Sequence, residues 1–363
     1  MKHISFIITF SVILLMIGCQ NNSGNKYHRV IDSSELEDLI EDFNEGDVSW
    51  DDFREIISDS LNHKVVYEWS VKEAKKNNPT GQFLLGRCYN NGYGIGKDLK
   101  KAVQWYQKAA EQGNSNAQFA LGVCYYNGEG VEKDLKKAFQ LFQKAAEQGN
   151  SNGQNGLGVC YRNGEGVERD LEKAVQWYQK AAEQGNSDAQ YNLGKRYRNG
   201  EGVEKDLEKA VQWYQKAAEQ GFSWAQYSLG VCYRDGEGVE KDLEKAFELF
   251  QKAAEQGHSN GQYNLGECYF YGKGIQKNYI KAFEWYKKSA ESGDSKAQYR
   301  LGYCFELGIG TNRNEKKSFE WYKKSADNGY NEAIRKVASC YQKGIGVRRN
   351  RDLAEKWLKL ADQ

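Results

Sequence analysis

A strict internal period of 36 residues runs through most of this chain. A glycine recurs at 36-residue steps from Gly86 to Gly302, Ala338 takes the eighth place, and no residue is inserted or deleted between them. A fixed period of this length marks a repeat array, in which each unit packs only on its neighbours. A chain of 363 residues would otherwise suggest several separate domains, but the period predicts one continuous repeat array instead.

Each period has the pattern of two helices. In the second unit, apolar residues recur at helical spacing, first at Ala117, Leu121 and Cys124, then at Ala138 and Phe142. Two glycines separate the segments and allow the chain to leave the first helix through left-handed backbone angles. An Asp or Asn then stands where the second helix needs an N-cap. The sequence therefore predicts an all-α fold, an α/α solenoid of eight 36-residue helix pairs.

One stretch carries the pattern of a known family most clearly. The unit that begins at Asp188, DAQYNLGKRYRNGEGVEKDLEKAVQWYQKAAEQG, resembles the Sel1-like repeat, a relative of the tetratricopeptide repeat. The resemblance covers about Pro79 to Gln363. It implies a right-handed superhelix of helix pairs and a role as an adaptor or scaffold for other proteins, without naming the partner.

The residues before the repeats keep traces of the same period. Trp69 lies 36 residues before Trp105, but the two loop glycines are missing. The apolar end of a repeat array needs an atypical unit to cover it. Residues 33–78 are therefore predicted to form a helical N-terminal cap, a degenerate repeat, ahead of the eight repeats at 79–363.

The first residues have the layout of a sorting signal. A positive start precedes a mostly apolar run from Ile4 to Ile17, which is shorter than a comfortable membrane span. The Gly-Cys pair that follows resembles the lipobox of bacterial lipoproteins. We therefore predict a signal peptide at 1–18, lipidation of Cys19, and a flexible tether at 19–32. An uncleaved membrane anchor with an incidental cysteine is the alternative.

The residue after Cys19 bears on location. Gln20 stands where many lipoproteins retained at the inner membrane carry Asp. The expected location is the bacterial cell envelope, with the protein held to a membrane through its N-terminal lipid and the outer membrane favoured over the inner one.

Composition and motifs argue against nucleic-acid binding, metal binding and catalysis by this protein. Lys plus Arg is 51 and Asp plus Glu is 50, so the chain lacks the basic excess of a nucleic-acid binder. The seven cysteines after Cys19 share one repeat position, where neighbours should lie about 8–10 Å apart, too far for a disulfide. We interpret them as small core residues. No zinc-ligand cluster, nucleophile–base pair or phosphate-binding loop is present in the sequence, so we predict no enzyme, no metal and no cofactor.

Related tetratricopeptide folds bind ligands on a concave face lined by residues of the first helices. Carried over by repeat position, the candidates for partner binding are Arg162, Arg198, Arg234, Tyr191, Tyr227, Asn127, Asn163, Asn199, Lys195 and Trp224. Tyr and Arg are favoured interface residues, and Asn can bond the main chain of an extended peptide. An ordinary solvated helix surface is an equal alternative for the arginines, and a turn role is favoured for the asparagines.

Together these features predict a membrane-anchored scaffold or adaptor. It would bind an unknown protein or peptide on its concave face, as a monomer, and the row of arginines suits an acidic ligand. A passive structural component of the envelope, without a specific ligand, is the alternative.

Overall fold

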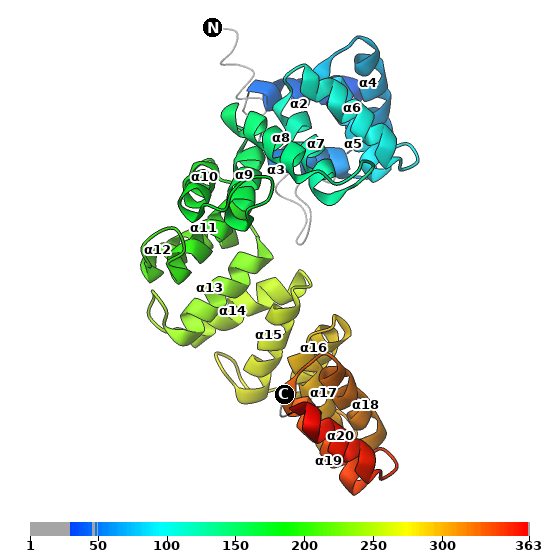
Figure 1. The fold of residues 1–363 in the computed structure, drawn as a ribbon, viewed down its shortest axis with the longest axis vertical. Helices are drawn as coiled ribbons and strands as arrows, with labels where there is room; N and C mark the ends of the chain where they lie inside the picture. Colours follow the sequence, from blue (N-terminus) through cyan, green and yellow to red (C-terminus); the bar gives the residue numbers. More distant parts are fainter. Residues whose placement is uncertain (1–29, 46–47, 49, 362–363) are drawn as a thin grey trace. The chain divides into compact units, whose positions relative to one another are not determined.

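The computed structural model describes residues 30–45, 48 and 50–361, in which helices are the only regular secondary structure (Figure 1). The predicted signal peptide, Cys19 and residues 19–29 of the predicted tether lie outside the described residues. None of the described helices has the length and apolar character needed to cross a bilayer. The chain divides into two compact units, Met1–Lys133 and Asp134–Gln363.

The helices of the two units follow one another along the chain. The first unit contains α2 (Ser33–Glu45), α3 (Trp50–Ser58), α4 (His63–Lys75), α5 (Pro79–Asn91), α6 (Leu99–Glu111) and α7 (Ser115–Asn127). The second contains α8 (Leu135–Glu147), α9 (Ser151–Asn163), α10 (Leu171–Glu183), α11 (Ser187–Asn199), α12 (Leu207–Glu219), α13 (Ser223–Asp235), α14 (Leu243–Glu255), α15 (Ser259–Tyr271), α16 (Tyr279–Glu291), α17 (Ser295–Leu307), α18 (Glu315–Asp327), α19 (Asn331–Lys343) and α20 (Arg351–Ala361). Repeats 1 to 8 run from the pair α5–α6 to the pair α19–α20, so odd-numbered helices open each repeat.

Local side-chain chemistry sets the ends of the helices. In repeat 3, Asn150 accepts a bond from the Gly153 N–H at the start of α9, and Asp170 accepts one from the Lys173 N–H at the start of α10. Between them, α9 ends at Gly164, whose φ of 75° is left-handed. The predicted caps and loop glycines are therefore confirmed, and their recurrence explains why the helix lengths repeat.

Close contacts through glycine hold the helices of the second unit together. Within repeat 3, a Cβ on Gly158 would lie 2.7 Å from the ring of Tyr178, which is wholly buried in α10. Between repeats, a Cβ on Gly202 would overlap the carbonyl group of Leu171 in the preceding repeat. Within each of the two units the helices pack on one another in chain order, so the fold is the predicted all-α solenoid.

The segment before repeat 1 matches the repeat period only in part. Helix α4 begins and ends 36 residues before α6, whereas α3 does not align with α5 at that offset. The α3–α4 connection is the short stretch 59–62, without the two glycines that allow the repeat loop. Instead, the buried Asn62 accepts a bond from the Ile31 N–H and donates one to the Ile56 carbonyl. The period therefore extends to the second helix of this segment and not to the first.

The seven cysteines of the repeats are free and buried, and all of them lie on odd helices. Burial raises the pKa of the Cys160 thiol to about 12 and that of Cys232 to about 11. Such thiols stay protonated at neutral pH and pack as small apolar groups.

Candidate functional site

The predicted partner-binding residues lie on the odd helices, most of them in the second unit. We call the partly exposed side chains of α9, α11, α13, α15 and α17 the odd-helix surface. Its three arginines share one repeat position, but the structure gives them different surroundings.

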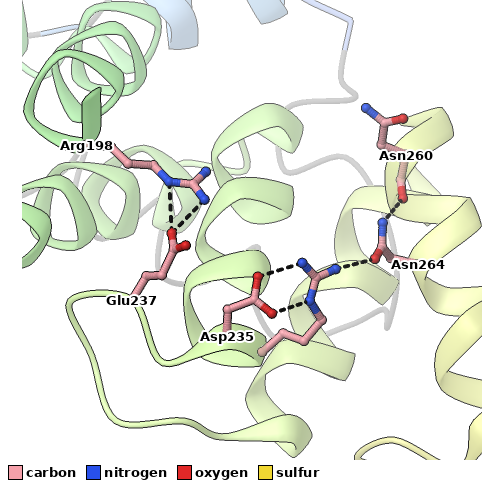
Figure 2. Close-up of polar contacts among 6 residues, drawn as sticks. Arg198, Asp235, Glu237, Asn260 and Asn264 are labelled. Atoms are coloured by element: carbon pink, nitrogen blue, oxygen red, sulfur yellow. Dashed lines mark hydrogen bonds and ion pairs between the residues drawn. The ribbon is translucent and has the colours of Figure 1, made fainter. Parts of the chain in front are cut away.

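Arg198 of α11 is tied to the next repeat. Its Nε and Nη2 both donate to Oε2 of Glu237, at 3.0 and 2.6 Å, and Glu237 lies in the loop that follows α13 (Figure 2). The guanidinium therefore already has a carboxylate partner from this chain.

Arg234 of α13 is engaged more completely. Its Nε and Nη2 donate to the two carboxylate oxygens of Asp235 at 2.8 and 2.7 Å, which holds the pKa of that carboxyl below its usual range. Its Nη1 donates to the Asn264 side-chain oxygen at 2.8 Å, and Asn264 in turn donates to the carbonyl of Asn260 (Figure 2). Arg162 differs from both, because its Nε bonds only the neutral Asn163, at 2.9 Å.

The predicted asparagine row serves the loops between the helices. Asn163 donates to Glu165 at 3.0 Å and Asn199 to Glu201 at 2.9 Å. In the first unit, Asn127 likewise donates to the glutamate two residues ahead of it, at 3.0 Å. Each pair spans the helix end and the start of the repeat loop, the turn role that the sequence favoured.

An aromatic cluster covers the start of α13. It consists of Tyr191, Phe222, Trp224, Tyr227 and His258. Tyr191 contacts both Phe222 and Trp224, with ring centroids 5.5 and 6.4 Å apart. The His258 ring lies edge-on to Trp224 at 4.4 Å and stacks on Tyr227 at 5.0 Å. Trp224 nevertheless remains 50% exposed.

Sequence reasoning named Trp224, Tyr191 and Tyr227 but missed Phe222 and His258. The available signal was the departure from the repeat, since polar residues fill the Phe222 and Trp224 positions in repeats 2 to 4. The Tyr191–Phe222 contact recurs as Tyr299–Tyr330, at 5.4 Å, whereas the tryptophan is found only at the start of repeat 5 among the equivalent positions of the repeats.

Two hollows lie next to the aromatic cluster. The smaller, of about 250 Å³, is lined by Tyr227, Arg234, Asn260, Tyr263, Asn264, Asp294, Ser295 and Lys296. The larger, of about 280 Å³, is lined by Arg234, Asp235, Leu243, Ala246, Phe250, Tyr263, Asn264, Glu267, Cys268 and Lys273. Because both share Arg234, Tyr263 and Asn264, and Tyr227 joins the smaller one to the aromatic cluster, these features form one mixed surface over repeats 4 to 7.

Carboxylates replace cations farther along the odd-helix surface. Glu267 of α15 accepts a bond from the Tyr286 hydroxyl at 2.6 Å and pairs with Arg300 of α17 at 2.8 Å. Glu306 accepts from the hydroxyl of Tyr322 at 2.6 Å and pairs with a lysine of repeat 8. Each of the two glutamates therefore has a hydroxyl and a cation as partners, and the cation ties it to the following repeat. Among the described residues, no cluster of three or more metal-ligating side chains occurs.

The repeats match a family pattern along almost their whole length. A model of the Sel1 repeat matches eight consecutive segments: 79–114, 115–150, 151–186, 187–222, 225–258, 259–294, 295–330 and 331–361. The chain belongs to the Sel1 repeat family. The fifth match begins two residues late and passes over Ser223 and Trp224, so the exposed tryptophan lies at a departure from the Sel1 pattern.

Two solved structures are similar to this Sel1 repeat chain. One is c5321, a protective antigen present in uropathogenic Escherichia coli strains and displaying an SLR fold, with 38% identity and a TM-score of 0.69. The match covers 81% of this chain but only 63% of the antigen's. The other is a Sel1 repeat protein from Oxalobacter formigenes, with 34% identity, a TM-score of 0.62 and coverage of 68% and 97%. No protein of curated function matches the chain.

Membership of the Sel1 repeat family bears on the class of function. Sel1 repeat proteins are generally protein–protein interaction scaffolds, and their solenoids are generally non-enzymatic. The question for this chain is therefore which surface a partner contacts.

The histidine of the aromatic cluster predicts a pH dependence of stability. His258 caps α15, because its Nδ1 accepts a bond from the Gly261 N–H at 3.1 Å, and burial lowers the pKa of the ring. The unfolded ring has a pKa of about 6.5. As pH falls below that value, the unfolded state binds a proton that the folded state resists, so stability is lost until the folded pKa is reached.

We therefore expect the urea midpoint of unfolding to fall between pH 7.5 and pH 5, and His258→Asn to reduce that fall. Asn caps the same position in repeats 2 to 4, so the variant keeps the helix start. Circular dichroism in urea measures both proteins at both pH values. An equal fall in the variant would show that other groups set the pH dependence.

Proposed function

We propose that the protein is a lipid-anchored scaffold of the bacterial envelope that, as a monomer, holds a polypeptide partner against the odd-helix surface of repeats 4 to 7. Trp224 carries this proposal. A half-exposed tryptophan ringed by other aromatic side chains is the kind of residue on which binding energy concentrates in protein interfaces.

The surroundings of Trp224 support a polypeptide ligand. The neighbouring hollow offers an apolar wall from Tyr227 and Tyr263, beside the amide groups of Asn260 and Asn264. Apolar surface with a few placed hydrogen-bonding groups suits side chains and main chain of a polypeptide. A passive envelope component has no need of such a surface.

Site-directed cross-linking in intact cells tests this function. A photoreactive residue at Lys296, which lines the smaller hollow and is exposed, should give a saturable adduct with one partner. The same residue at Lys216 on α12, an even helix, is the matched control and should give none. Trp224→Asn restores the polar character of the position and should weaken capture about thirty-fold, the effect of losing about 2 kcal/mol.

The outcome separates scaffold from passive component. Binding at this surface would be contradicted if the adduct did not saturate, or if it formed equally from Lys296 and Lys216. It would also be contradicted if the Trp224→Asn variant captured the partner as well as the parent does. Circular dichroism establishes that the variant keeps its helical content.

The anchoring part of the proposal rests on the sequence Gly18-Cys19 after a short apolar run. Cys19→Ala should remove the acceptor of the lipid and leave the protein unprocessed or outside the membrane fraction. Metabolic labelling with a fatty acid measures the lipid directly. Normal labelling and processing of the variant would sink the lipoprotein assignment.

A further inference from the structure

The hydroxyl of one core tyrosine lacks the hydrogen-bond partner that two of its counterparts have. Tyr178 of α10 is wholly buried, yet its hydroxyl makes no hydrogen bond. An unsatisfied buried polar group costs folding free energy, so such a group calls for an explanation. Tyr286 and Tyr322, at the same repeat position, donate to Glu267 and Glu306. In both later repeats the acceptor is a carboxylate carried by an odd helix.

Two of the repeat positions that carry those carboxylates hold cations instead, one in the repeat of Tyr178 and one in the next repeat, while the Glu267 position in the repeat of Tyr178 holds Val159. Arg162 occupies in repeat 3 the position that Glu306 holds in repeat 7, and Lys195 occupies in repeat 4 the position that Glu267 holds in repeat 6. Both side chains are partly buried. The sign of the charge is therefore reversed at two matching places of the odd-helix surface.

A third cation lies in the same region. Arg196 replaces the cysteine of the other repeats and is only 5% exposed; it pairs with Glu201, while its buried Nε has no hydrogen-bond partner. Burial lowers the pKa of Lys195, and repulsion from Arg196 and Arg162 lowers it further. Burial raises the pKa of Tyr178 to about 12, with Arg162 and Arg196 opposing the rise. The later repeats show the same neighbours: Phe270 and Tyr303, at the Arg162 and Lys195 positions, have ring centroids 6.4 Å apart, and Phe270 lies 6.2 Å from Tyr286, at the Tyr178 position. The Arg162 position is therefore beside both the Tyr178 and the Lys195 positions.

Neither Arg162 nor Lys195 forms an ion pair within the described residues, and Glu201, the carboxylate that attracts Lys195, is paired with Arg196. Arg162 bonds a neutral asparagine, and the Lys195 ammonium lies over an aromatic ring. In repeats 6 and 7 each glutamate is balanced by a cation of the following repeat. The corresponding places beside these two cations hold the neutral Asn192 and Ser228.

We infer that Arg162, Tyr178 and Lys195 form a binding site for a carboxylate of the polypeptide partner. The inference rests on the proposed function and names one chemical feature of the ligand, an aspartate or glutamate side chain or a chain terminus. Charge-assisted hydrogen bonds from Arg162 and Lys195 hold the carboxylate. The Tyr178 hydroxyl donates to it once the long, partly exposed Arg162 side chain turns toward the ligand, as its counterparts donate to Glu267 and Glu306.

The test uses the full chain and a fluorescein-labelled tetraglutamate with blocked ends, followed by fluorescence anisotropy at low ionic strength. The parent should bind the peptide, and added salt should weaken binding because the charges are partly exposed. Arg162→Gln with Lys195→Gln should raise the Kd about tenfold. Tyr178→Phe should raise it about threefold, and repeats 2 and 5 already carry Phe at that position.

A matched control removes the same charge elsewhere. Lys180 and Lys216 lie over the Trp177 and Trp213 rings on even helices, and replacing both by Gln should leave the Kd within about twofold, as expected for distant screened charges. An equal loss in this control, or equal binding of tetraglutamine, overturns the site. Inorganic phosphate and acetate are then compared as competitors of the labelled peptide. If phosphate displaces the peptide at a lower concentration than acetate does, the cations bind phosphate in preference, and the carboxylate site is also overturned.

The peptide reports on the cation site independently of the aromatic cluster. Trp224→Asn should leave the Kd for tetraglutamate unchanged, which supports a separate site, whereas a large rise would contradict the assignment to Arg162, Tyr178 and Lys195. Failure of cross-linking at Lys296 with peptide binding intact would count against the proposed function alone.

Discussion

Gly202→Ala is expected to lower the free energy of unfolding by about 3 kcal/mol, more than any other alanine substitution in the loops of repeat 4. Gly202 has a left-handed φ of 71°, a conformation that costs an L-residue about 1–2 kcal/mol. A Cβ there would also overlap the Leu171 carbonyl group of repeat 3, and backbone atoms cannot rotate out of the way. The two repeats would have to separate locally, at about 1–3 kcal/mol for overpacking.

A second glycine of the same repeat separates the two causes. Gly221 has a φ of 85°, but a Cβ there would meet no atom within 4 Å. Gly221→Ala should therefore cost only about 1–2 kcal/mol, the conformational part. Urea unfolding followed by circular dichroism compares the two variants, and hydrogen exchange over α10 and α11 locates the loss. Equal destabilisation by both substitutions would show that the contact between repeats 3 and 4 contributes little.

The helix pairs and their ends could be predicted from the sequence because each depends on residues a few positions apart. The Asp170 cap and the left-handed Gly164 are determined within one repeat, and the period then copies them along the chain. Comparing the repeats with one another also identified Trp224 as a residue of the odd-helix surface. Sequence periodicity is thus sufficient for the solenoid and for part of the candidate site.

Pairing between repeats could not be predicted in the same way. Arg198 and Glu237 are 39 residues apart, and their contact depends on how two repeats stack. Three arginines at one repeat position looked alike in the sequence, yet only Arg162 lacks a carboxylate partner among the described residues. The binding row expected from Arg162, Arg198 and Arg234 is therefore replaced, as a hypothesis, by a cation site in repeats 3 and 4 and an aromatic surface at repeat 5.

Glu267→Val is expected to have the other large effect, a loss of about 3 kcal/mol in the free energy of unfolding. The glutamate bonds both Arg300 and the wholly buried Tyr286, and the ion pair is shielded, with side-chain exposures of 17% for Glu267 and 24% for Arg300. Removing one partner of such a pair leaves the other charge desolvated without compensation, which typically costs about 3–5 kcal/mol when burial is complete. Because Arg300 is partly exposed, we expect the cost here to lie at the lower end of that range, about 3 kcal/mol.

The chain itself contains the matched control for that prediction. At the repeat 5–6 junction the three corresponding positions hold Val231, Phe250 and Asn264, an arrangement without the carboxylate. The triple variant Glu267→Val, Tyr286→Phe, Arg300→Asn copies this arrangement and should return the free energy of unfolding to within about 1 kcal/mol of the parent, because no charge or hydroxyl is left unpaired. Urea titrations of the parent, the single and the triple variants give the coupling directly. If Glu267→Val costs less than about 1 kcal/mol, solvent screens the pair as at an exposed surface, and the link between repeats 6 and 7 then rests on apolar packing alone.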